Sequence, residues 1–66
     1  MKGKTVIVKV FTGEMVRRKI WSVGQNVVYV TDEKNYELLT EDKPAVIPVG
    51  VPKADVFEEY GTRLTV

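Results

Sequence analysis

The chain has 66 residues, a formal net charge of +1, and neither cysteine nor histidine. Without these two residue types, disulfide cross-links, thiolate metal cages and mechanisms that need an imidazole are excluded. We expect one domain, residues 1–66, folding on its hydrophobic core alone. No apolar run approaches the roughly 20 residues of a membrane span, so we expect a soluble, cytoplasmic protein.

The apolar residues are mostly of the β-branched kind. The chain holds 13 valines and 3 isoleucines and, with 6 threonines, these make up a third of its length. Such side chains are stiff at χ1 and fit a pleated sheet better than a helix. The composition therefore predicts an all-β fold.

Three strands are predicted in the first half of the chain. Thr5–Phe11 alternates with one fully apolar face, Thr12-Gly13 is a turn, and Glu14–Trp21 is the returning strand. The apolar residues of this returning strand fall on both faces, which is typical of a bulge or a strongly bent strand. Val27–Thr31 is the third strand.

The middle of the chain is less regular. Tyr36–Leu39 fits a strand or one helical turn, and the pattern does not choose between them. Ala45–Val51 is predicted as a strand, and Pro48 within it indicates an edge or bulged position because proline cannot donate to a ladder.

A short helix and a closing strand are predicted at the end. Pro52 suits the first helical position, and Val56 and Tyr60 then share one face, with Gly61 ending the helix. Thr62–Val66 can form the last strand. The expected fold is a small barrel of five or six short strands with one helical turn before the last strand, since closure removes unpaired edges.

Two segments resemble SH3-like small barrels. Gly50–Phe57 is similar to the Gly-apolar-Pro segment that forms the 3₁₀ turn before the last strand in SH3 domains. Val23–Val30 resembles the Val-Gly-Asp entry to a barrel strand in translation, chromatin and phage modules. The resemblance implies an SH3-like barrel.

A narrower resemblance is to the archaeal Sul7-type chromatin proteins. It covers Lys19–Gly24, which looks like their Lys-Val-Trp-x-Val-Gly segment, and the strand after it. In that family the tryptophan and the following valine lie on the DNA-binding sheet, which implies such a place for Trp21 and Val23. The family's apolar wedge falls here on Asn26, a poor residue for separating base steps.

Catalytic groups are scarce. Ser22 is the only serine, no glycine-rich phosphate loop is present, and the adjacent carboxylates fall in predicted turns or on a helix surface. These pairs are Asp32-Glu33, Glu41-Asp42 and Glu58-Glu59. We expect no enzyme activity, no cofactor, no metal site and no small-molecule substrate.

The charge is unevenly distributed. The first 19 residues carry six basic side chains against Glu14 alone, whereas residues 32–59 carry eight acidic side chains against three basic ones. Because the first two predicted strands are neighbours, their basic side chains can share one face. The alternative is ordinary mixed surface charge that maintains solubility.

The candidate binding residues follow from this charge and from the aromatic side chains. They are Arg17, Arg18, Lys19, Trp21 and Tyr29, with Tyr36 a weaker candidate for the same aromatic patch. Trp21 shares its parity with Arg17 and Lys19, yet a single tryptophan is also a frequent core residue. Phe11, Phe57 and Tyr60 are expected in the core.

Three functions fit these observations. The first is a non-enzymatic protein-interaction or accessory module, of the kind that viruses, phages and mobile elements encode. The second is binding of DNA or RNA through the basic and aromatic face. The third is self-association in which the strand containing Pro48 pairs with a symmetry mate.

Overall fold

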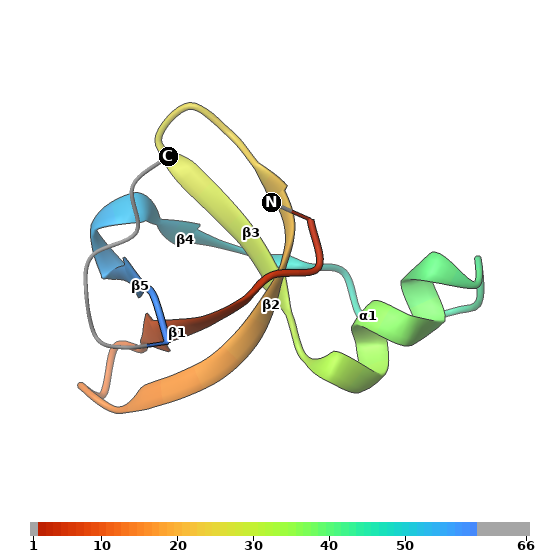
Figure 1. Cartoon of the computed structure of the whole chain (residues 1–66), viewed down its shortest axis with the longest axis horizontal. Coiled ribbons are helices and arrows are strands. Elements are labelled where there is room, and N and C mark those ends of the chain that lie inside the picture. The colour runs from red at the N-terminus through yellow and green to blue at the C-terminus, as the bar shows by residue number, and fades with distance from the viewer. Residues whose placement is uncertain (1, 60–66) are drawn as a thin grey trace.

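The computed structural model describes residues 2–59 and shows one antiparallel sheet (Figure 1). Its strands follow the order β4-β3-β2-β1-β5. The elements along the chain are β1 (Thr5–Lys9), β2 (Met15–Val23), β3 (Val27–Thr31), α1 (Glu33–Thr40), β4 (Val49–Pro52), the 3₁₀ turn η1 (Lys53–Asp55) and β5 (Val56–Phe57). The all-β fold is confirmed, with one short helix between β3 and β4.

Strand β2 joins two halves of the sheet. Its residues Met15–Lys19 pair with β1, and its residues Lys19–Val23 pair with β3. The register shifts between Ile20 and Ser22, so that the residue between them has no direct partner on β3. The predicted bulge is confirmed, and in Figure 1 β2 curves strongly from one half to the other.

The core contains residues from both halves of this bent sheet. It consists of Val6, Val8, Ile20, Val28, Val30 and Val56, all buried. Strands β4 and β5 are the two edges, and within residues 2–59 no pairing between them closes the sheet. The buried valines of β1 and β3 occupy alternate positions along each strand, as a period of two predicts.

The turn after β1 is longer than predicted. The Val10 N–H donates to the Glu14 carbonyl (2.9 Å) and the Gly13 N–H to the Val10 carbonyl (2.8 Å), so three residues form the loop. Gly13 has φ of 90°, the left-handed residue that such three-residue hairpin loops require. Phe11, expected in the core, lies in this loop and is fully exposed.

The ambiguous segment around Tyr36 is part of helix α1. Asp32 caps it, because its carboxylate accepts the Asn35 N–H at 2.7 Å. The Asn35 side chain accepts the Val46 N–H at 3.2 Å, which connects the helix to the chain entering β4. In Figure 1 α1 extends away from the sheet, and no residue of α1 is buried. No helix among residues 2–59 is long and apolar enough to cross a membrane.

The helix predicted from Pro52 is wrong in extent. Only the three residues of η1 are helical, and Val56 continues as β5 opposite Val8 of β1. Val56 is fully buried and Phe57 half-buried, so both pack as strand residues. The helical turn before the last described strand is confirmed, whereas Tyr60, Gly61 and the closing strand Thr62–Val66 lie outside the described residues.

The outer edge of β4 is nearly free of donors. The Lys53 N–H donates to the Asn26 carbonyl, so alternation directs the N–H groups of Val49 and Val51 toward β3. The Gly50 N–H then points away from β3, toward the free edge. Its neighbours on that edge, Pro48 and Pro52, have no N–H. The edge position indicated by Pro48 is confirmed, and β4 begins only after that residue.

Candidate binding surfaces

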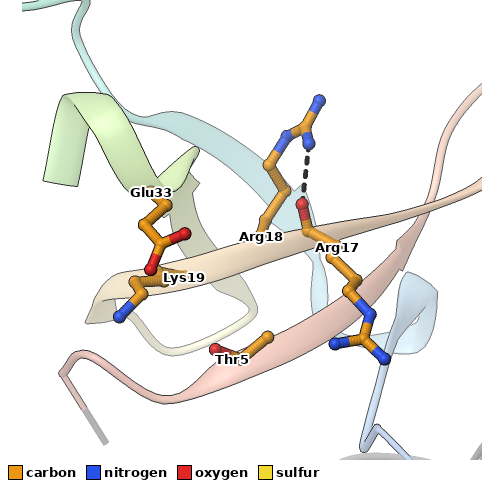
Figure 2. Close-up of a pocket in the computed structure, with 5 residues that line it drawn as sticks. All are labelled: Thr5, Arg17, Arg18, Lys19 and Glu33. Carbon is orange, nitrogen blue, oxygen red and sulfur yellow. Dashed lines mark hydrogen bonds between the residues drawn. The ribbon is translucent and has the colours of Figure 1, made fainter.

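The three consecutive basic residues of β2 do not share one face. Arg17 lies opposite Ile7 and Lys19 opposite Thr5, on the outer face of the sheet, whereas Arg18 lies opposite the buried Val6. Figure 2 shows Arg18 on the other side of the β2 ribbon from Arg17 and Lys19. Two of the three predicted residues therefore share the outer face.

Arg18 has a structural contact of its own. Its Nη1 donates to the Arg17 carbonyl at 2.7 Å, drawn as the dashed line in Figure 2. The Ile20 N–H donates to the carbonyl of Lys4, the residue before β1, so by alternation the Arg17 carbonyl faces away from β1. Pairing with β3 starts only at Lys19. Arg18 thus satisfies an acceptor at an unpaired strand edge, while its half-buried stem covers the core.

A basic hollow lies where β2 meets the start of α1. It has a volume of about 300 Å³ and, among the described residues, Thr5, Arg17, Arg18, Lys19 and Glu33 line it (Figure 2). Glu33 is the one acidic side chain in this lining. Three cations around one acid favour an anionic ligand, since the positive field is only partly compensated.

Ion pairs reduce this positive charge at the neighbouring positions. The Lys4 ammonium lies 2.8 Å from the Glu58 carboxylate, and Arg17 Nη1 lies 3.7 Å from that of Glu59. The four side chains are 29–71% exposed, so water screens both pairs and they contribute little to stability. They can be exchanged for contacts with another anion.

Trp21 is half-buried in a small aromatic pair. Its ring meets that of Tyr36 edge to face, with centroids 5.8 Å apart and planes at 77°. Lys2 Nζ lies 3.8 Å from the Trp21 centroid, and Lys19 Nζ lies 5.2 Å from the Tyr36 centroid. Trp21 therefore belongs neither to the core nor to the freely exposed surface.

The first residues of the chain lie against this pair. The Gly3 N–H donates to the Ile20 carbonyl at 2.8 Å. Gly3 has φ of 88°, and a Cβ built on it would lie 2.7 Å from Tyr36 Oη. The positive φ favours glycine at this position, and a larger residue would also have to displace the Tyr36 hydroxyl. Lys2 was not found from the sequence, because no local pattern links it to Trp21.

Tyr29 occupies a different part of the outer face. It lies on β3 opposite Ser22 and Gly50, and its ring edge approaches the Gly50 backbone. It is 40% exposed. Tyr36, the weaker candidate, is the residue that meets Trp21, so Tyr29 is not part of that aromatic pair.

A second, apolar hollow opens between β1 and β4. Its volume is about 450 Å³. Its described lining consists of Val8, Lys9, Val10, Phe11, Val49, Gly50, Val51, Pro52 and Asp55. Phe11 is 102% exposed and Val49 is 62% exposed, although both line this hollow beside the core residue Val8. The signal in the sequence was the uncharged run Pro44–Pro52, in a chain with 29% charged residues.

The described residues offer little for chemistry. Within residues 2–59, no three acidic side chains gather closely enough to hold a metal ion. Ser22, the only serine, is exposed on the outer face. Comparison with protein-family models, curated proteins and solved structures found no match.

Proposed function

We propose that the chain is a non-enzymatic protein-interaction module that binds its partner at the apolar hollow. The observation that carries the proposal is Phe11, fully exposed at the rim of a hollow that opens onto the core. Protein interfaces are built around aromatic anchors in uncharged surroundings, with charged residues at the rim. The hollow has this composition, with Lys9 and Asp55 as its charged members.

The energetics support the same surface. Val46 and Ile47 are exposed just before β4 and Val49 is exposed at its first position, in addition to Phe11. Covering one large apolar side chain stabilises a complex by roughly 1.5–3 kcal/mol. A partner that covers Phe11 and Val49 together therefore gains several kcal/mol before the cost of association is subtracted.

We also propose that the fold is an SH3-like barrel. The supporting observations are the strand order β4-β3-β2-β1-β5 and the turn η1 directly before β5. The bent strand β2, shared by both halves of the sheet, supports the same assignment.

The proposal predicts that Phe11→Ser abolishes partner binding. The full chain serves as bait in extracts of its source, and captured proteins are quantified by mass spectrometry. Val23→Ser is the matched control, because Val23 is 40% exposed but does not line the hollow. A partner retained by Val23→Ser and lost by Phe11→Ser supports the function, whereas equal capture by both variants contradicts it.

A second candidate function is binding of single-stranded DNA or RNA at the basic hollow. The observation in its favour is that Lys2 and Lys19 lie on the Trp21–Tyr36 pair, beside the basic hollow. Phosphates bind basic side chains and bases stack on aromatic rings, so the two features together fit a nucleic-acid strand. The pairing of Arg17 with Glu59 and the net charge of +1 weigh against high affinity.

This candidate predicts quenching of tryptophan fluorescence by a short oligonucleotide at low salt. The double variant Arg17→Gln/Lys19→Gln should flatten the dependence of log K on log salt by about 1.4, because two phosphate contacts are lost. Lys43→Gln/Lys53→Gln removes the same charge from two residues that do not line the basic hollow, and should leave the slope unchanged. Unaltered emission of the unmodified protein would exclude this function.

A further inference from the structure

We infer that the apolar hollow receives a second copy of this chain, with Phe11 of each copy inserted into the hollow of the other. The inference rests on the proposed function, since it names the partner of that same surface. Its first support is that the protruding side chain and the hollow that would receive it lie on the same surface, because Phe11 is fully exposed and also borders the hollow. A two-fold interface requires such a self-complementary patch.

The shape of the hollow suits this occupant. Its volume of about 450 Å³ lies between aliphatic residues of the two halves of the sheet, Val8 and Val10 on one side and Val49 and Val51 on the other. A benzyl side chain that enters there meets aliphatic groups on both sides. The three-residue loop places Phe11 outside its own core, where a neighbouring copy can reach it.

The charged residues of the hollow are complementary to those of a copy. Lys9 and Asp55 both line it and carry opposite signs. Neither takes part in the three ion pairs that join described residues. When Phe11 of one copy enters the other, Lys9, two residues away on the same chain, comes to the rim where the second Asp55 lies. The two-fold axis then repeats this pair.

Two further features favour side-chain exchange over strand pairing. The net charge of +1 opposes the approach of two copies only weakly. The edge of β4 offers one outward N–H, that of Gly50, between two prolines, so a ladder between copies cannot extend. The inference therefore places self-association at Phe11 and not at the strand that contains Pro48.

Sedimentation equilibrium of the full chain tests the inference. The apparent mass should rise from 7.5 kDa toward twice that value as concentration increases. Phe11→Ser should weaken the dimer at least about tenfold, because central aromatic anchors carry most of an interface's free energy. Val23→Ser should leave the dimer unchanged. A strict monomer at the highest attainable concentration overturns the inference.

A charge exchange identifies the interface. Lys9→Glu and Asp55→Lys, each alone, should weaken the dimer, and the double variant Lys9→Glu/Asp55→Lys should restore it, because the pair is re-formed with reversed sign. Failure of the double variant to recover overturns the two-fold arrangement. If the chain is a monomer that still captures another protein through Phe11, the dimer is refuted and the proposed function stands. If Phe11→Ser does not change what the chain captures, the proposed function itself is refuted.

Discussion

Replacing Ile20 by alanine is expected to unfold a large share of the protein at room temperature. Among residues 2–59, Ile20 is the largest fully buried side chain, and it lies on β2, where the two halves of the sheet meet. Isoleucine-to-alanine substitutions in a core cost about 2–5 kcal/mol. A domain of this size is stabilised by roughly 3–10 kcal/mol in total, so the loss approaches the whole stability.

Urea titration followed by far-UV circular dichroism measures this effect. Ile47→Ala is the matched control, because it deletes the same atoms from a side chain that is 81% exposed. We expect the control to change the free energy of unfolding by no more than about 0.5 kcal/mol. Comparable losses for both variants would contradict the assigned core.

The second large effect is expected from the prolines of β4. The double variant Pro48→Val/Pro52→Val adds outward N–H groups on both sides of Gly50, which gives the edge three alternating donors. The resulting edge is uncharged and β-branched, the composition that promotes strand pairing between chains. We expect concentration-dependent assembly into species much larger than a dimer.

Light scattering and thioflavin fluorescence against time measure this assembly. Pro44→Val is the matched control, since Pro44 precedes β4 and borders no part of the sheet edge. Assembly should persist when Phe11→Ser is combined with the double proline variant, because it depends on the backbone. A double variant that sediments like the unmodified chain would show that the prolines do not protect this edge.

Alternation made the central strands predictable. On β1 every second residue is buried, so a period of two was sufficient to find the apolar face that carries Val6 and Val8. Val27–Thr31 was correctly predicted as a strand, and its buried residues are Val28, Val30 and Thr31. The mixed parity of β2 correctly indicated the irregularity next to Ile20. These features depend only on neighbours in the chain, which is why the sequence contains them.

Tertiary pairing decided the elements that were predicted incorrectly. Val56 fits a helical stripe as well as a strand, and only its pairing with Val8 selects β5. Phe11 was expected in the core as a large aromatic residue, but it does not share the parity of the buried Val6 and Val8, and it lies in the loop that the Val10–Glu14 hydrogen bond closes. Helix α1 begins at the cap formed by Asp32, whereas four residues from Tyr36 onward give too short an apolar pattern to reveal it.

The candidate surfaces were predictable only in part. Parity correctly grouped Arg17 and Lys19 on the outer face, and Lys19 and Trp21 both contact Tyr36. The contact between Lys2 and Trp21 joins positions 19 residues apart, and the apolar hollow joins β1 to β4. Neither arrangement has a local signature, because each arises from the bend of the sheet.

Helix α1 is attached to the sheet by only a few contacts. The eight-residue helix has no fully buried residue, and it is held by the capping carboxylate, the Asn35 acceptor and the contact of Tyr36 with Trp21 on β2. Isolated helices of this length are marginal in water, so we expect α1 to open at the cost of these few contacts, while the ladders of β1 to β4 remain. The connection between β3 and β4 can therefore be lengthened or exchanged at small entropic cost, which makes it the natural place for an inserted segment.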